Sequence, residues 1–489
     1  MKLTADVGII AAGPAGLCAA VSASEAGASV VVFEKANNVG GTANMGMGPF
    51  GVESRIQKAA FSNLTKEDVF RKFMDYVHWH TDARLVHEYF WKSGETIDWL
   101  EDMGVKFAGA VKYFPDSEAT WHVVQPEDGS IPGPRAASTM NRILYRRAQE
   151  LGARFLLETP ATRIIKEDGK VCGILGKNAQ GEEVELRCKA VIVATGGFGC
   201  NPEMIREYTG LDFGKNVFNF AVPGIVGDGI RMVWEIGGAK GRMSIEATGG
   251  VSPIGDSDPE AIELRGVFSQ ANLTVNKQGF RICDESIMQN SSVAANIIDE
   301  QTGKRVYNIV DDSIIKRFRR NGMPFSSNVF GSGNIDNFDE RFTKLTELYP
   351  DCYYAADSLE ELADKIGMNR ENFVETVEEY NDACDDNYDE LFGKNRKYLL
   401  PYRGKRFYAA VGCIGGYGTL GGIKVNWKQE VVDTEFNPIP GLWGAGSDIN
   451  EIYDGTYMFY FPGNTMGFAV NTGRIAGERA ADYALSLED

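Results

Sequence analysis

The sequence predicts an α/β protein whose N-terminal part is a parallel, doubly wound sheet. Residues 3–10 have the composition of a buried strand, residues 14–26 that of an alanine-rich helix closed by Gly27, and residues 29–35 that of a second strand. This order of elements in so short a stretch is typical of a βαβ unit. The 43% of apolar residues and the 56 glycines indicate a globular chain rather than a fibrous or disordered one.

The residues that follow alternate between helical and strand patterns. Apolar side chains recur at three- and four-residue spacing where helices are expected, and buried apolar runs mark the strands. A hairpin turn is expected at residues 167–170. Helices are expected at residues 57–104, 139–151 and 465–485, a turn followed by a short helix at residues 227–238, and strands at residues 154–165 and 190–199.

The composition changes between residues 245 and 418. Charged helical segments such as residues 358–386 appear there, and the glycine-rich strand ends that come before and after are absent. The glycine-rich pattern returns from residue 419. One domain interrupted by an insertion explains this return better than two domains in series. We therefore expect a domain in two parts, residues 1–244 and 419–489, around an inserted domain at residues 245–418.

The charge and the cysteines exclude several classes of partner. Fifty Lys and Arg against 68 Asp and Glu give a net charge of −18, which argues against nucleic acid or an anionic membrane. We see neither a signal-peptide pattern nor an apolar run of about 18 residues that could span a membrane. The eight scattered cysteines form no C-x-x-C pair, and no cysteine lies among the four histidines. We expect a cytoplasmic protein without a metal site.

A phosphate-binding turn is predicted at residues 11–16, Ala-Ala-Gly-Pro-Ala-Gly. Gly13 lets the backbone approach a pyrophosphate, Gly16 lets the helix pack closely on the strand, and the helix N-terminus offers N–H groups to phosphates. Glu34, at the end of the second strand, can accept hydrogen bonds from ribose hydroxyls and disfavours a 2′-phosphate. Ala11 replaces the usual first glycine, so the motif alone leaves open a tight turn that binds nothing.

Five further motifs follow in order, at residues 34–48, 194–199, 227–229, 441–448 and 462–469. With them the chain, from residue 6 to about residue 481, resembles the flavoprotein-subunit family of fumarate reductases and succinate dehydrogenases. That family also holds the 3-ketosteroid dehydrogenases and related enone and enoate reductases. The resemblance implies a Rossmann-type FAD-binding domain with an inserted α+β capping domain.

The resemblance also implies which residues bind FAD. The ADP half would be held by Ala12, Gly13, Pro14, Ala15, Gly16, Glu34 and Lys35. The pyrophosphate and isoalloxazine would be lined by Gly41, Thr42, Ala43 and Gly48, and the adenosine side by Ala161, Ala194, Thr195 and Gly196. Asp228 would lie near the ribitol, Asp448 takes the place of a glutamate common in the family, and Asn464, Thr465 and Met466 would meet the pyrimidine edge of the flavin. Because no histidine occurs between residues 2 and 77, the FAD is expected to be non-covalent.

The expected substrate site lacks the residues that bind dicarboxylates. Dicarboxylate members of the family hold two carboxylates with Arg and His, and one Arg delivers the proton. Here no Arg occurs from residue 407 to residue 473, and Gln289 stands where the proton-delivering Arg would fall. An aromatic, arginine-free wall suits a flat, apolar or phenolic substrate instead. Its expected members are Tyr453, Tyr457, Phe459, Tyr460 and Phe461 before Gly463, with Tyr417 nearby in the sequence.

These residues predict hydride transfer between flavin N5 and a carbon β to a carbonyl, in either direction. Tyr457 or Tyr460, with Tyr417 as a further candidate, would exchange the proton at the α carbon, and the Gly463 N–H would polarise the carbonyl. Each tyrosine could instead simply pack a domain interface. The loop at residues 113–123, with Tyr113 and His122, could close the pocket or only pack.

Three alternatives stay open at this point. They are a dicarboxylate reductase that uses other residues, an oxidase of amines or amino acids, and a flavin-holding electron carrier without a substrate pocket. The sequence holds no second nucleotide fingerprint, so electrons are expected to pass to or from a separate protein, a free reduced flavin or a quinone.

Overall fold

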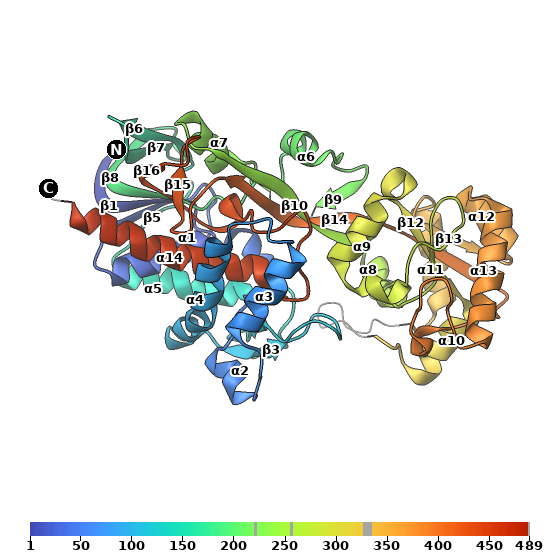
Figure 1. The fold of residues 1–489 in the computed structure, drawn as a ribbon. Helices are drawn as coiled ribbons and strands as arrows, with labels where there is room; N and C mark the ends of the chain where they lie inside the picture. The colour runs from blue at the N-terminus through green and yellow to red at the C-terminus, as the bar shows by residue number, and fades with distance from the viewer. Residues whose placement is uncertain (220–222, 255–257, 326–334, 488–489) are drawn as a thin grey trace. The chain divides into compact units, whose positions relative to one another are not determined.

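The computed structural model describes residues 1–219, 223–254, 258–325 and 335–487 (Figure 1). It contains two compact units. The first unit comprises Met1–Gly210, Ala221–Glu246 and Gly418–Asp489, and the second comprises Leu211–Phe220 and Ala247–Tyr417. Both contain helices and strands, which confirms the α/β class. The domain boundaries expected at 244/245 and 418/419 stay a prediction, because β10 (Lys240–Val251) and β14 (Phe407–Ile423) run through these positions without a break.

The main sheet of the first unit has the strand order β15-β16-β8-β1-β2-β5. Its centre is β1 (Lys2–Ile10), which runs parallel to β2 (Val30–Phe33) on one side and to β8 (Glu183–Val193) on the other. Ile10 pairs with Phe33 and with Val193, so all three strands end at the same edge. In doubly wound sheets ligands bind outside this edge. The other strands of the unit are β3 (Phe107–Val111), β4 (Trp121–Val124), β5 (Arg154–Leu156), β6 (Ala161–Glu167), β7 (Lys170–Lys177), β15 (Glu430–Val432) and β16 (Pro438–Gly444).

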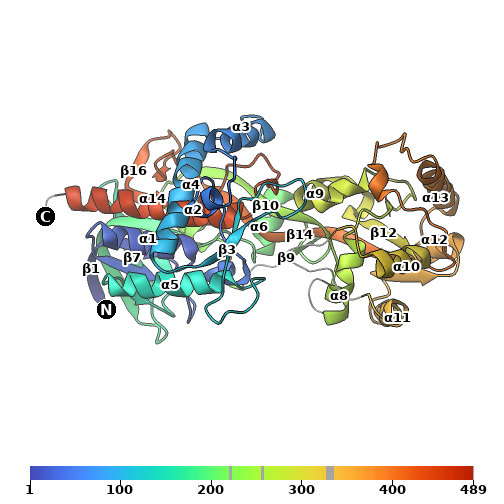
Figure 2. The ribbon, with the colours of Figure 1, turned by 90° about the horizontal axis from the view of Figure 1, so that it is seen from below.

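Three helices of the first unit lie side by side: α1 (Pro14–Glu25), α5 (Ala137–Glu150) and α14 (Asn464–Ser486) (Figure 2). The approach of α14 to α1 depends on glycine, because a Cβ on Gly473 would lie 2.2 Å from the Ala15 carbonyl oxygen. A Cβ on Gly477 would lie 2.5 Å from the Ala19 carbonyl oxygen. The other helices of this unit are α2 (Arg55–Ala59), α3 (Lys66–Tyr76), α4 (Ala83–Asp102), α6 (Pro202–Thr209) and α7 (Asp228–Glu235), with 3-10 turns η1 (Gly41–Met45) and η5 (Gly446–Ile449).

Two segments expected as single elements are divided. Residues 57–104 form the end of α2, then α3 and α4, because Thr65 and Asp82 cap the N-termini of two new helices. The strand expected at residues 154–165 becomes β5, which pairs with β2, and β6, which pairs with β7. Pro160 lies between the two strands and lacks the N–H that a continuous ladder would need.

The second unit is built around β14. The strands β12 (Val306–Asp311) and β13 (Tyr353–Ala356) pair with it in antiparallel fashion, and β9 (Val217–Asn219) pairs with it in parallel. β11 (Thr274–Val275) pairs with β12. This mixed sheet with its helices has the α+β character that the sequence predicts for the insertion. The helices are α8 (Pro259–Phe268), α9 (Ser291–Asp299), α10 (Asp312–Asn321), α11 (Phe338–Leu348), α12 (Leu359–Ile366) and α13 (Arg370–Asp385), and the 3-10 turns are η2 (Glu285–Gln289), η3 (Thr302–Lys304) and η4 (Arg396–Tyr398).

A cluster of four paired charges is buried in the second unit. Arg281 lies 2.8 Å from Glu285 and 2.8 Å from Asp389, and Lys394 lies 2.9 Å from Glu285. All four side chains are buried, and their charges cancel. Removal of any one would leave an uncompensated charge, which is the costly way to break such a cluster.

In the part of the chain that the structure describes, no helix is long and apolar enough to cross a membrane.

Candidate functional site

The turn before α1 leaves space beside Gly13. A Cβ on Gly13 would meet no described atom within 4 Å, and a Cβ on Gly41 would lie 3.7 Å from the Gly13 Cα. Gly13 caps the helix without a side-chain hydrogen bond. The first-turn N–H groups of α1 therefore lack a capping acceptor, which is the condition in which a helix N-terminus binds phosphate.

Ala11 and Gly16 close the base of this turn. A Cβ on Gly16 would lie 2.0 Å from the Ala11 carbonyl oxygen, so the close approach of helix to strand requires glycine there. Ala11 has a φ of +82°, in the left-handed region that disfavours any residue with a Cβ. The alanine that replaces the usual first glycine thus adopts the backbone conformation of a glycine.

Glu34 is buried beside the same turn. One of its carboxylate oxygens accepts the Ala12 N–H at 2.7 Å, and the other accepts the Ala36 N–H at 2.7 Å. Each oxygen keeps further lone-pair capacity, so the carboxylate can order the turn and still accept a ribose hydroxyl. The next residue, Lys35, lies 2.7 Å from Asp228 at the start of α7, which joins two of the expected FAD residues.

Asp448 holds the glycine-rich segment that follows β8. Its buried carboxylate accepts hydrogen bonds from the N–H and the hydroxyl of Thr195, and from the Gly197 N–H at 2.7 Å. Burial raises the pKa of Asp448, while these hydrogen bonds oppose that rise. Ala194 is buried immediately after β8, and Ala161 is partly exposed at the beginning of β6.

Residues 41–48 meet the beginning of α14. A Cβ on Gly46 would lie 2.5 Å from the Met466 Cε, and a Cβ on Gly48 would lie 1.9 Å from the His122 carbonyl oxygen. Thr42 and Ala43 lie on η1, within the same segment. The structure therefore brings together two groups of expected FAD residues that are far apart in the sequence.

The N-terminus of α14 is surrounded by buried polar side chains. The Asn464 side-chain oxygen accepts the Tyr89 hydroxyl at 2.6 Å, whereas its amide nitrogen has no hydrogen-bond partner among the described residues. The Thr465 N–H donates to the Tyr457 hydroxyl at 2.9 Å, and the Thr465 hydroxyl donates to Glu246 at 2.6 Å. Burial raises the pKa of Tyr457 well above its ordinary value, so this hydroxyl keeps its proton.

Gly463 caps α14 with a φ of +83°, and a Cβ there would lie 2.7 Å from Trp121. Both observations require glycine at this position.

Aromatic side chains near the N-terminus of α14 pack on one another in pairs. Tyr453 packs on Tyr457 with ring centroids 4.9 Å apart, and Tyr113 stacks on Phe459 at 5.0 Å. Tyr460 is partly exposed and contacts Phe114 at 5.5 Å. Tyr417 lies on β14 in the second unit and is partly exposed.

The family model of the FAD binding domain matches residues 6–459. The chain belongs to this family. A vinyl phenol reductase of Lactiplantibacillus plantarum is 31% identical, over 98% of this chain and 96% of that one. A fumarate reductase (cytochrome) of Shewanella frigidimarina is 29% identical over 98% of this chain and 78% of that one. Among solved structures, a 3-ketosteroid-Δ4-(5α)-dehydrogenase from Rhodococcus jostii RHA1 in complex with 4-androstene-3,17-dione has a TM-score of 0.76 at 23% identity, with 98% and 97% of the two chains covered.

As a member of the FAD binding domain family, the chain is an FAD-dependent oxidoreductase. This confirms the resemblance and the enzyme class predicted from the sequence. Within the described part of the chain the residues fit the cofactor: Gly13 opens on space that a side chain would fill, no side chain caps α1, and the buried Asn464 amide nitrogen has no hydrogen-bond partner. The individual FAD contacts expected from the sequence stay a proposal.

Sequence reasoning missed Glu246. It lies on β10, is 6% exposed, and donates or accepts no hydrogen bond in the described structure other than the one from Thr465. Burial raises the pKa of this carboxyl to about 7. The only signal in the sequence is an acid in a short alternating stretch, "RMSIEA", which is equally typical of a strand with one solvent-exposed face.

The His122 side chain is buried and not exposed to solvent. Its Nε2 lies 2.7 Å from the Ser54 hydroxyl, and its Nδ1 lies 3.1 Å from the Thr120 carbonyl oxygen. Burial lowers the pKa of His122 to about 4, so the imidazole is neutral. With both ring nitrogens engaged inside the first unit, His122 fits the packing alternative better than that of a proton donor.

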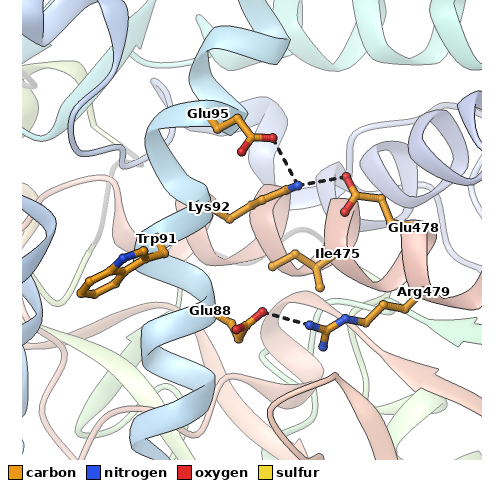
Figure 3. Close-up of a pocket in the computed structure, with 7 residues that line it drawn as sticks. All are labelled: Glu88, Trp91, Lys92, Glu95, Ile475, Glu478 and Arg479. Atoms are coloured by element: carbon orange, nitrogen blue, oxygen red, sulfur yellow. Dashed lines mark hydrogen bonds and ion pairs between the residues drawn. The ribbon is translucent and has the colours of Figure 1, made fainter.

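A separate hollow of about 260 Å³ lies between α4 and α14 (Figure 3). Its charged side chains pair with one another: Lys92 lies 3.2 Å from both Glu95 and Glu478, and Arg479 lies 2.9 Å from Glu88. None of the residues expected to bind FAD lines this hollow.

Proposed function

We propose that this FAD-dependent oxidoreductase acts on a carbon–carbon double bond next to a carbonyl in a flat, aromatic or apolar substrate. The observation that supports this best is Tyr457, whose hydroxyl is held by the Thr465 N–H at the N-terminus of α14. No Arg occurs from residue 407 to residue 473 to bind a substrate carboxylate. The bound FAD would supply or accept the hydride.

In this proposal the tyrosine hydroxyl exchanges the proton at the carbon α to the carbonyl. Tyr457 suits the role because it is protonated and its oxygen already accepts one hydrogen bond, which leaves its own proton to donate. Tyr460 is the second candidate because it is partly exposed, and Tyr417 is the third. The Gly463 N–H would polarise the carbonyl, and Asn464, Thr465 and Met466 would face the flavin at the N-terminus of α14, where the helix dipole stabilises negative charge.

A second candidate substrate has no carbonyl. The relative that is 31% identical over nearly the full length of both chains is named for the reduction of a vinyl phenol. In a hydroxystyrene the phenol oxygen can take the electronic role of the carbonyl, because the ring conjugates it with the double bond. The same tyrosine and aromatic side chains would serve, so this candidate differs in substrate and not in the residues required.

The supply of electrons is part of the proposal. A separate protein, a free reduced flavin or a quinone would provide or accept them, and the FAD would be bound without a covalent link. A cytoplasmic location stays a prediction.

The dicarboxylate alternative is disfavoured by the missing arginines, and nothing specific favours an oxidase of amines or amino acids. An electron carrier without a substrate pocket would bind FAD but show no response to small ligands.

The test is anaerobic reoxidation of the dithionite-reduced protein. It would be mixed with a 3-ketosteroid enone, a hydroxycinnamate, a vinyl phenol and fumarate, while the flavin absorbance is followed. We expect reoxidation by one of the first three and not by fumarate. Rapid reoxidation by fumarate would refute the argument from the missing arginines, and no response to any compound would favour the electron carrier.

Two variants then test the tyrosine. We expect Tyr457→Phe to slow reoxidation by about 10²- to 10⁴-fold, the usual contribution of a positioned acid. Tyr453→Phe is the matched control. The Tyr453 hydroxyl is buried without a partner among the described residues, and the Tyr453 ring packs on the ring of Tyr457. Equal rates in wild type and Tyr457→Phe would move the role to Tyr460 or Tyr417.

A further inference from the structure

Glu246 is a buried carboxyl whose one hydrogen-bond partner among the described residues belongs to the N-terminus of α14. The Thr465 hydroxyl donates to it at 2.6 Å, and the N–H of the same threonine donates to Tyr457. One residue thus joins the carboxyl to the tyrosine proposed to exchange a proton. Two further buried polar atoms of this region, the Tyr453 hydroxyl and the Asn464 amide nitrogen, have no partner among the described residues.

No cation of the described chain pairs with Glu246 to hold it ionised. In the described part of the chain it forms no ion pair, and the titratable groups that affect one another there are Glu246 and four tyrosines, Tyr76, Tyr89, Tyr453 and Tyr457. Arg242, on the same strand, directs its guanidinium to Asp454 and its N–H to Glu451. Lys424 pairs with Glu451. The cations Arg242 and Lys424 therefore already pair with other carboxylates.

We propose that Glu246 couples electron transfer to protonation: its carboxylate takes one proton from solvent when two electrons enter the site at the N-terminus of α14. The inference rests on the proposed position of the flavin beside Asn464, Thr465 and Met466. The proton neutralises the carboxylate as the site gains negative charge, and it returns to solvent when the electrons leave. Glu246 acts through charge and through Thr465, so it is a positioning residue rather than a proton donor to the substrate.

The direction of the coupling follows from electrostatics. Burial raises the pKa of Glu246 and the Thr465 hydroxyl opposes that rise by stabilising the carboxylate, so that the pKa is about 7. Added negative charge nearby raises the pKa further. At a pH between the pKa of Glu246 before the electrons enter and its higher pKa afterwards, entry of two electrons therefore brings in one additional proton. Tyr453 and Tyr457 have pKa values well above their ordinary range, so they stay protonated throughout.

The test is the midpoint potential of the bound FAD measured against pH, which needs no substrate. One extra proton per two electrons steepens the slope by about 30 mV per pH unit. In wild type we expect this steeper segment to begin near pH 7, where the carboxyl titrates. In Glu246→Gln the segment is absent, and an indicator dye records about one proton fewer taken up per two electrons. Equal slopes in the two proteins would overturn the inference.

Thr465→Val supplies a second, independent test. The variant removes the hydroxyl that stabilises the carboxylate but keeps the side-chain shape, so the pKa of Glu246 rises and the steep segment moves to higher pH. If Glu246→Gln fails to bind FAD, this shift decides the matter, and an unshifted segment refutes the coupling. These potentials are independent of the substrate panel. The proposed function can therefore fail while the coupling holds, and the reverse.

Discussion

Gly13→Ala separates the binding of FAD from the stability of the fold. In the structure Gly13 has a φ of −70° and a ψ of −179°, which alanine adopts freely, and its Cβ would meet no described atom within 4 Å. The substitution should therefore change the free energy of unfolding of the apoprotein by less than about 1 kcal/mol, because restriction of the unfolded chain and the poorer N-cap preference of alanine oppose each other. The same methyl group would occupy the space that we assign to the pyrophosphate.

The expected loss of affinity follows from the hydrogen bonds at the N-terminus of α1. Each charge-assisted hydrogen bond contributes about 1.5–3 kcal/mol, so displacing the phosphate from one or two N–H groups costs about 3 kcal/mol. That corresponds to an increase of roughly a hundredfold in the dissociation constant. The assay is titration of apoprotein with FAD, followed by flavin fluorescence, together with thermal unfolding of the same apoprotein.

Two further variants make the result decisive. In Gly16→Ala the Cβ would lie 2.0 Å from the Ala11 carbonyl oxygen, so the apoprotein itself should lose stability. Gly133→Ala adds a methyl group in a loop whose nearest described atom is 4.0 Å away, and it should change neither quantity much. Unchanged affinity in Gly13→Ala would refute the phosphate site at this turn. A Gly13→Ala apoprotein destabilised by more than about 2 kcal/mol would refute the open space.

Three other substitutions test the site residues. Ala11→Gly should stabilise the apoprotein by up to about 1 kcal/mol, measured by unfolding in urea. Relief of the left-handed strain contributes about 1–2 kcal/mol, which exceeds the cost of the added freedom of the unfolded chain. A loss of stability would contradict this reasoning. Glu246 has a pKa of about 7 in the folded protein against 4.5 for an ordinary glutamate, so its contribution to stability is complete below pH 4.5 and is lost as the pH rises through 7. This loss is on the order of 3 kcal/mol, and unfolding in urea from pH 5 to pH 8 should show it in wild type but not in Glu246→Gln. Asp448→Asn places an amide donor against the donors of Thr195 and Gly197 and should cost about 1–3 kcal/mol in the same assay, whereas an unchanged midpoint would show that these hydrogen bonds contribute little.

The first βαβ unit could be predicted because its signals are local. A short apolar run, an alanine-rich helix and a turn glycine specify residues 3–10, 14–26 and 29–35, and the structure places β1, α1 and β2 within two residues of those bounds. The long strand β14 could not be predicted in this way. It contains six glycines between residues 412 and 422, which carry little strand preference of their own, so its continuity depends on pairing with β9, β12 and β13.

The candidate site likewise contains features with local sequence signals and features that depend on long-range contacts. Glycine turns and the acid at residue 34 are visible in the sequence because each needs one residue type at one position. The contacts that join Lys35 to Asp228, and Thr465 to Glu246, link residues about 190 to 220 positions apart. No local pattern specifies such pairs, since they depend on how β10, α7 and α14 pack. Glu246 was missed for this reason.

The residues that replace the missing arginines suggest what the site selects. A dicarboxylate brought to the N-terminus of α14 would add two negative charges beside Glu246, where no described cation is unpaired: Arg242 faces Asp454, and Lys424 faces Glu451. Without a bidentate partner, such charges lose their hydration and gain little in return. A neutral aromatic substrate would avoid that cost and would pack on the partly exposed ring of Tyr460. The aromatic residues and the buried carboxyl therefore support the same proposal, a site for a neutral aromatic substrate rather than for a dicarboxylate.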